Sequence, residues 1–173
     1  MLLEDYYKSK QDYFYRDITY VGSESEYVDM IIHSSTLYVG DIAESVNESR
    51  LWEVFSTIKL HEDENNMNNN TDITEINKIT NTISTPIKRI IMGKNKRDCS
   101  RVGFAFIEFY TPYYARRAQQ LLNGMRLDNK YIKCDIDYGF VEGREYGRGY
   151  YGGQFKNDSK RQKKVQARGR RWL

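Results

Sequence analysis

The segment Arg101–Tyr110, "RVGFAFIEFY", alternates its large apolar side chains with a period of two, which is the pattern of a β-strand. Phe104 and Phe106 fall on one face of this strand, whereas Ala105 and Ile107 fall on the other. Both faces are apolar, so we expect one face to pack in the core and the other to contact a ligand. The segment therefore predicts a central strand with a packed face and an aromatic face.

Neighbouring segments complete the order strand, helix, strand, strand, helix, strand. The predicted strands are 35–42, 86–93, 101–110 and 130–136, and the predicted helices follow Ser45 and Thr111. Ser45 and Glu48 have the spacing of a capping box, while Thr111 suits the N-cap that precedes Pro112. This order predicts an α+β fold of the split βαβ type, with one four-stranded antiparallel sheet and two helices on one face.

The face without helices carries three aromatic rings. Tyr38, in the first strand, points to the same side as Phe104 and Phe106. An exposed apolar patch of this size is typical of a binding surface, so we expect the three rings to be exposed and to contact a ligand. The alternative is that a third helix covers them.

Composition separates the chain into a body and extensions. The 173 residues suit one domain with arms, and seven of the 27 basic residues fall within 160–171, so the rest has 20 basic against 24 acidic residues. The segment 61–85 is rich in Asn and Thr and predicts a disordered insert. The tail 160–173 is either a solvated arm or a nuclear-import or RNA-contacting segment.

The sequence predicts neither a membrane span nor a signal peptide. No run of 18 apolar residues occurs, and the first residues lack a basic start followed by an apolar stretch. The two cysteines, Cys99 and Cys134, are expected to be reduced thiols. Only His33 and His61 are present, with no nucleophile–base or metal-ligand spacing, so we expect neither an enzyme nor a bound cofactor or metal.

Two motifs resemble the signatures of the RNA recognition motif. "GFAFIEF" matches the eight-residue signature except at its first position, where Val102 stands in place of Lys or Arg. "LYVGDI" matches the six-residue signature, with Asp41 where Asn is commoner. The resemblance implies that Tyr38, Phe104 and Phe106 stack on nucleobases.

A narrower resemblance rests on "YRD" at 15–17 and above all on "DIDYGFVEGREYGRGYYGGQF" at 135–155. These segments resemble the small subunits of the nuclear cap-binding complex. That family binds the 7-methylguanosine triphosphate 5′ cap of nuclear RNA polymerase II transcripts and supports pre-mRNA processing, splicing and RNA export. The resemblance implies a nuclear protein, with shuttling to the cytoplasm left open, and a large helical-repeat subunit as its partner.

The same resemblance implies the residues that contact the cap. Tyr15 and Tyr38 would sandwich the methylated purine, because a cationic ring between aromatic faces gains cation–π attraction. Asp135 and Asp137 would accept the guanine N–H donors. Lys133, where the family usually has Arg, would reach the guanine or orient Asp135. The residues implied as phosphate contacts are Arg144, Arg148, Gln154, Phe155 and Lys156. Phe104 and Phe106 would stack on the base that follows the methylguanosine or pack against the N-terminal arm. Phe155 and Lys156 depart from the Val and Arg of the family, and Ile136 departs from its Trp.

The expected organisation is an N-terminal arm (1–33) that closes over the cap, an RNA recognition motif (34–137), a cap-binding loop (138–159) and the basic tail. Two other interpretations remain open on the sequence. One is a general single-stranded-RNA-binding splicing regulator, and the other is a protein-interaction module whose sheet is covered.

Overall fold

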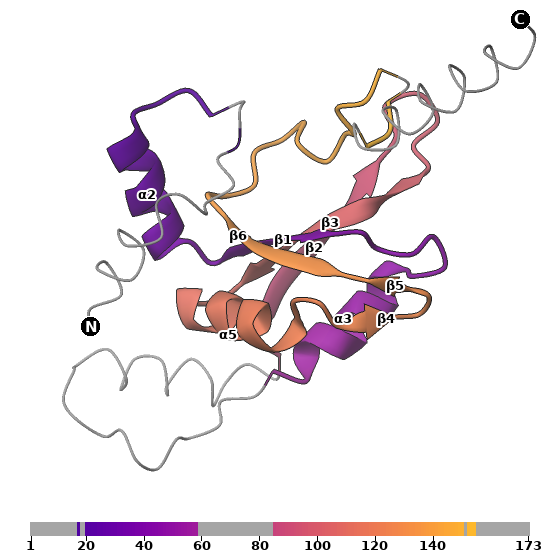
Figure 1. The fold of residues 1–173 in the computed structure, drawn as a ribbon, viewed down its shortest axis with the longest axis horizontal. Helices are drawn as coiled ribbons and strands as arrows, with labels where there is room; N and C mark the ends of the chain where they lie inside the picture. The colour runs from indigo at the N-terminus through magenta and orange to yellow at the C-terminus, as the bar shows by residue number, and fades with distance from the viewer. Residues whose placement is uncertain (1–16, 18–19, 59–84, 151, 155–173) are drawn as a thin grey trace, which may run out of the picture.

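Four strands form one antiparallel sheet in the part of the chain that the computed structural model describes, which is residue 17 and residues 20–58, 85–150 and 152–154. The strands are β1 (Thr36–Gly40), β2 (Ile87–Lys94), β3 (Arg101–Phe109) and β6 (Lys133–Asp137). Their order is β2-β3-β1-β6, so β3 and β1 are central and β2 is at one edge (Figure 1). Each neighbouring pair is antiparallel, which confirms the predicted fold class.

Two helices, α3 (Glu48–Ser56) and α5 (Pro112–Leu122), pack on one face of this sheet. The alternation predicted for β1 and β3 is confirmed, because Leu37, Val39, Ala105 and Ile107 are completely buried in the core between sheet and helices. Leu51 and Phe55 of α3 and Ala115 and Ala118 of α5 fill the other side of that core. Full burial of a Leu or Phe side chain contributes about 1.5–3 kcal/mol, so this layer stabilises the platform that holds the opposite face.

The start of α3 differs from the prediction. Asn47 is the N-cap, and its side chain accepts a hydrogen bond from the Arg50 N–H at 2.8 Å. The predicted capping box of Ser45 and Glu48 is wrong because the helix begins later, and the Ser45 hydroxyl instead donates to Asp128 at 2.5 Å. Both Ser and Asn are good caps, so the choice between them depended on where the chain leaves β1.

A further helix, α2 (Glu24–His33), precedes β1 and was not predicted. Its capping box is complete: the Glu26 N–H donates to the Ser23 hydroxyl at 3.3 Å, and the Ser23 N–H donates to the Glu26 carboxylate at 2.8 Å. Tyr27 and Ile31 are its buried residues, one turn apart. The Arg116 guanidinium of α5 donates to the Ile32 carbonyl, which fastens the end of α2 to the domain.

The fourth strand of the sheet is shorter than the predicted segment 130–136. Two short strands, β4 (Arg126–Leu127) and β5 (Lys130–Tyr131), form a separate hairpin, and only Lys133–Asp137 pairs with β1. Ile132 separates the two, because its N–H donates to the Met125 carbonyl at 3.0 Å and its side chain is completely buried. The predicted insert 61–85, except for Thr85, and the tail 160–173 lie outside the described residues.

Candidate nucleic-acid interface

The sheet face opposite α3 and α5 carries the three aromatic rings that the sequence placed there. Tyr38 is paired with Phe106 across β1 and β3, and their ring centroids lie 5.6 Å apart. Tyr38 also stacks on Phe104, with a centroid distance of 5.8 Å and an interplanar angle of 27°. The three side chains form one aromatic cluster, separate from the core under the helices.

The expectation that all three rings are exposed is wrong. Phe104 and Phe106 are only 6% and 3% exposed, while Tyr38 is half-buried. Phe140 packs against Phe106 at 5.4 Å, and the Arg144 guanidinium lies over the Phe106 ring at 4.8 Å. The chain that follows β6 therefore folds back over the aromatic cluster. The rings are covered by this loop and not by the third helix that the sequence left open as an alternative.

The ring of Phe104 also packs closely on the backbone of the neighbouring strand, β2. A Cβ built on Gly93 in β2 would lie 2.6 Å from the Phe104 ring, so this ring occupies the space that any other residue at position 93 would need. The close approach needs glycine there. Tyr38, which is half-buried, is the most exposed of the three rings.

Three charged side chains of β6 lie on the same face as Tyr38, since Cys134 between them points into the core. Asp135 is paired directly with Tyr38, whereas Lys133 is opposite Gly40 and Asp137 is opposite Thr36. Asp135 and Lys133 are exposed, and Asp137 is buried. Desolvation raises the pKa of the Asp135 carboxyl, and the charge of Lys133 opposes that shift.

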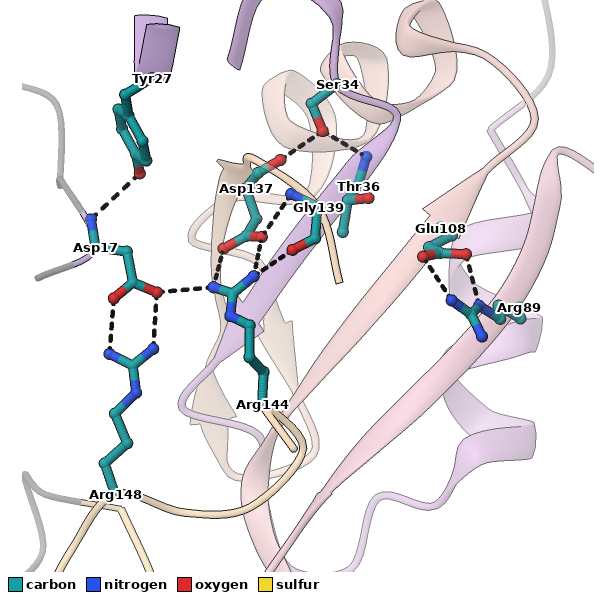
Figure 2. Close-up of polar contacts among 10 residues, drawn as sticks. All are labelled: Asp17, Tyr27, Ser34, Thr36, Arg89, Glu108, Asp137, Gly139, Arg144 and Arg148. Carbon is teal, nitrogen blue, oxygen red and sulfur yellow. Dashed lines mark hydrogen bonds and ion pairs between the residues drawn. The ribbon is translucent and has the colours of Figure 1, made fainter. Parts of the chain in front are cut away.

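Asp137 is held by a fork of Arg144. The two terminal nitrogens of this guanidinium donate to the two carboxylate oxygens of Asp137 at 2.7 and 2.8 Å (Figure 2). The Gly139 N–H donates to the same carboxylate at 3.0 Å, and the Asp137 carbonyl accepts from the Ser34 hydroxyl. Burial lowers the pKa of the Arg144 guanidinium, but the hydrogen bonds and charge of Asp137 outweigh it, so the pKa is raised and the group is charged.

Asp17 joins the segment before α2 to the loop after β6 (Figure 2). Its carboxylate accepts from Arg144 at 2.8 Å and from both terminal nitrogens of Arg148 at 2.9 and 2.7 Å. Its N–H donates to the Tyr27 hydroxyl at 3.3 Å, and the residue is only 3% exposed. Breaking one partner of a buried pair typically costs about 3–5 kcal/mol, so this network fixes the two segments together.

Three tyrosines pack beside this network. Tyr20, Tyr27 and Tyr138 contact one another with ring centroids 5.0 to 5.7 Å apart. The Arg144 guanidinium lies 4.3 Å from the centroid of Tyr138, in addition to its contact with Phe106. Arg144 is thus enclosed by two rings and two carboxylates, and its Nε is buried with no hydrogen-bond partner among the described residues.

The glycine-rich loop beyond Arg144 follows the tip of the β2–β3 hairpin. The Lys94 N–H donates to the Glu145 carbonyl at 2.7 Å, and the Gly147 N–H donates to the Lys94 carbonyl at 2.9 Å. Further along, the Gln154 side chain donates to the Gly103 carbonyl at 3.2 Å. This loop is therefore ordered against the sheet, and it brings Arg148 to Asp17 and Gln154 to β3.

The structure brings most of the candidate residues together on one face. These residues are Tyr38, Phe104, Phe106, Lys133, Asp135, Asp137, Arg144, Arg148 and Gln154. Tyr15, Phe155 and Lys156 lie outside the described residues. No role was predicted for Asp17, although the "YRD" motif contains it. Its place in that motif was the available signal, because Arg144 and Arg148 are 127 and 131 residues away in the chain.

The chemistry of the face suits an electron-poor flat ligand with an anionic group. An accessible Tyr ring lies beside an exposed carboxylate, and the side chain of Arg148 is 41% exposed despite its contact with Asp17. Within the described residues no group of three His, Cys, Asp or Glu side chains could hold a metal ion. A search of that same part of the chain finds no helix with the length and apolar character of a membrane span.

The chain is an RNA recognition motif protein by its fold and by its match to a family model. A model of the RNA recognition motif matches residues 65–133, a stretch that includes β2, β3, α5, β4 and β5. The match leaves out β1, which the structure places between β3 and β6. The solved RNA recognition motif of RNA15 has a TM-score of 0.42 at 19% identity, covering 65% of this chain and 95% of that one.

Comparison with curated proteins then gives the family. The nuclear cap-binding protein subunit 2 of Bombyx mori is 34% identical over 144 residues, which are 83% of this chain and 77% of that protein. The human protein of the same name is 36% identical over 144 residues, covering 83% of this chain and 76% of the human one. The chain belongs to the nuclear cap-binding protein subunit 2 family, as the sequence motifs had indicated.

Proposed function

We propose that this chain binds the 7-methylguanosine triphosphate 5′ cap of RNA, as the small subunit of a nuclear cap-binding complex. The observation that carries the proposal is the position of Tyr38, which has Phe106 as its neighbour in β3 and Asp135 as its neighbour in β6. A ring for stacking and a carboxylate for the guanine edge thus stand on adjacent strands. Membership in the family supports the same conclusion.

The methylated base would stack on Tyr38, with Tyr15 as the second ring. Methylation at N7 makes the purine cationic, and a cation between aromatic faces gains up to about 2 kcal/mol when desolvated. Asp135 would accept the adjacent N1–H and N2–H₂ donors of guanine. Asp137 already binds Arg144 through both oxygens, so we assign the guanine edge chiefly to Asp135 and give Asp137 a supporting role.

The triphosphate would lie over the glycine-rich loop. Arg148 is partly exposed and can turn one side of its fork to a phosphate, and Gln154 lies nearby with an amide donor. Arg144 is 11% exposed and is fully engaged with acids and rings, so its proposed role is to hold the loop in place. Phe155 and Lys156 follow Gln154 directly and stay candidates for the next contacts.

The proposed partner is the large helical-repeat subunit of the complex, and the proposed compartment is the nucleus. The exposed side of the domain offers an apolar surface for such a partner, because Tyr113 and Leu121 of α5 are 39% and 53% exposed. The chain would act as a binding subunit in RNA processing and export, without catalysis of its own.

The experiment that tests this function compares two transcripts of identical sequence, one with a 7-methylguanosine cap and one with a 5′ triphosphate, bound to the chain purified with its large subunit. The proposal expects the capped transcript to bind much more tightly. Equal binding of both transcripts would instead indicate a general single-stranded-RNA-binding protein. Binding of neither would favour a protein-interaction module.

A further inference from the structure

A second set of contacts lies on the ring-bearing face of the sheet, at its β2 edge and away from the Asp17 network (Figure 2). Arg89 of β2 donates to Glu108 of β3 through Nε at 2.6 Å and through one terminal nitrogen at 2.9 Å. The same guanidinium lies over the ring of Phe140, 5.4 Å from its centroid. Phe140 in turn packs on Phe106.

A bulge in β2 is the reason that Arg89 points to this face. Ile87 pairs with Phe109, but the next paired residue of β2 is Arg89, opposite Glu108, so Lys88 is the additional residue. Without the bulge, Arg89 would lie opposite Ile107, whose side chain is in the core. Glu108 is two residues from Phe106 in β3 and therefore shares its face.

The guanidinium of Arg89 is fixed in its plane and still accessible. Glu108 is 13% exposed and holds two of its nitrogens, while the Phe140 ring lies next to the guanidinium. The Arg89 side chain is nevertheless 53% exposed. Single-stranded RNA bases stack on Arg guanidinium planes as well as on aromatic rings, so this group has the geometry of a stacking platform.

The platform continues the aromatic cluster outward. Rings and guanidinium follow one another from Tyr38 through Phe106 and Phe140 to Arg89, with successive separations of 5.6, 5.4 and 5.4 Å. Since β2 is an edge strand of the sheet, an RNA chain can leave the domain there. The Arg89–Glu108 pair has no net charge, so it favours stacking over attraction of a phosphate.

We propose that Arg89, held by Glu108 and supported by Phe140, is a stacking site for a base of the RNA chain downstream of the cap. This inference rests on the proposed function, because it places the cap at Tyr38. The ligand is a nucleotide of the transcript body, read by its flat face and without sequence preference.

The test uses the full chain purified with its large subunit, titrated with m7GTP, GTP and an m7G-capped pentaribonucleotide. Arg89→Lys keeps the charge and loses both the plane and the fork. We expect it to weaken binding of the capped pentaribonucleotide by at least about fivefold and to leave m7GTP binding unchanged. Phe140→Leu should act in the same direction, whereas the exposed Arg126→Lys on β4 should change neither.

Three results would overturn the inference. Arg89→Lys could leave the affinity for the capped pentaribonucleotide unchanged, or weaken m7GTP equally, which would make Arg89 part of the cap site. Alternatively, Arg89→Ala could lower both the affinity and its salt dependence while Arg89→Lys lowers neither, which would indicate a phosphate contact. Failure of the proposed function is separate, because wild-type protein would then bind m7GTP and GTP equally.

Discussion

Arg148 and Asp17 are 131 residues apart in the chain, yet they form a two-bonded ion pair at 2.9 and 2.7 Å. Asp17 is only 3% exposed, and the guanidinium of Arg148 comes from the glycine-rich loop. One pair therefore couples the segment before α2 to the loop that follows β6. The proposed cap site takes Tyr15 from the first of these segments and Arg148 from the second.

Asp17→Asn should release the loop from the N-terminal segment. The amide cannot balance the charges of Arg144 and Arg148, and loss of one partner from a buried pair costs about 3–5 kcal/mol. We expect affinity for m7GTP to fall by about 100-fold or more, measured by titration of the complex. Asp29→Asn is the matched control, since Asp29 pairs with His33 on the surface, and normal cap binding by Asp17→Asn would contradict the coupling.

Gly147→Ala should detach the glycine-rich loop from the hairpin. A Cβ at position 147 would lie 2.4 Å from the Gly153 carbonyl oxygen, so backbone must move. We expect m7GTP binding to weaken by about tenfold or more, which corresponds to about 1.4 kcal/mol, with little change in the Tm of the domain. Gly153→Ala is the control because nothing lies within 4 Å of its Cβ, and equal effects of the two variants would argue against loop docking as the cause.

The pH dependence of cap binding should reflect Asp135. Desolvation raises the pKa of this carboxyl in the folded protein, and only the ionised form accepts both guanine donors. Affinity should therefore be constant above this raised pKa and fall as the pH drops through it, at a higher pH than an ordinary Asp would give. The titration of m7GTP affinity against pH checks this, and Asp135→Asn should remove the transition.

The same shift has the opposite sign for stability. A carboxyl whose pKa is raised on folding destabilises the folded state above that pKa, and the penalty disappears below the pKa of the unfolded chain. Asp135→Asn should thus unfold at a slightly higher Tm than wild type at pH 7 and at the same Tm in acid, while binding the cap about 10- to 100-fold more weakly. A lower Tm at pH 7 would contradict the role of desolvation.

Alternation along β1 and β3 was enough to assign Leu37 and Ile107 to the core and Tyr38 to the opposite face, because the period of a strand is local information. The cover over Phe106 was not predictable in this way. Arg144 reaches that ring through a loop whose course depends on Asp17, far away in the chain. Contacts set by tertiary structure leave no periodic signal.

The helix α2 is a different case, since its signal was present in the sequence. Ser23 and Glu26 have capping-box spacing, and Tyr27 and Ile31 supply one buried turn. At α3, conversely, Ser45 and Glu48 show the same spacing without forming a cap, because Ser45 binds Asp128. A capping motif therefore locates a helix start only when the side chain of the capping residue is not bound elsewhere in the fold.

Tyr38 is the central residue of the proposed cap site, and its role is tested by the ratio of m7GTP to GTP affinity, measured for the complex with wild-type chain and with Tyr38→Ala. We expect a strong preference for m7GTP in wild type and loss of most of it, up to about 30-fold, in Tyr38→Ala, because stacking on a cationic purine is lost. Tyr38→Phe should keep most of the preference. Equal affinities of the wild-type protein for m7GTP and GTP would contradict cap recognition by this chain.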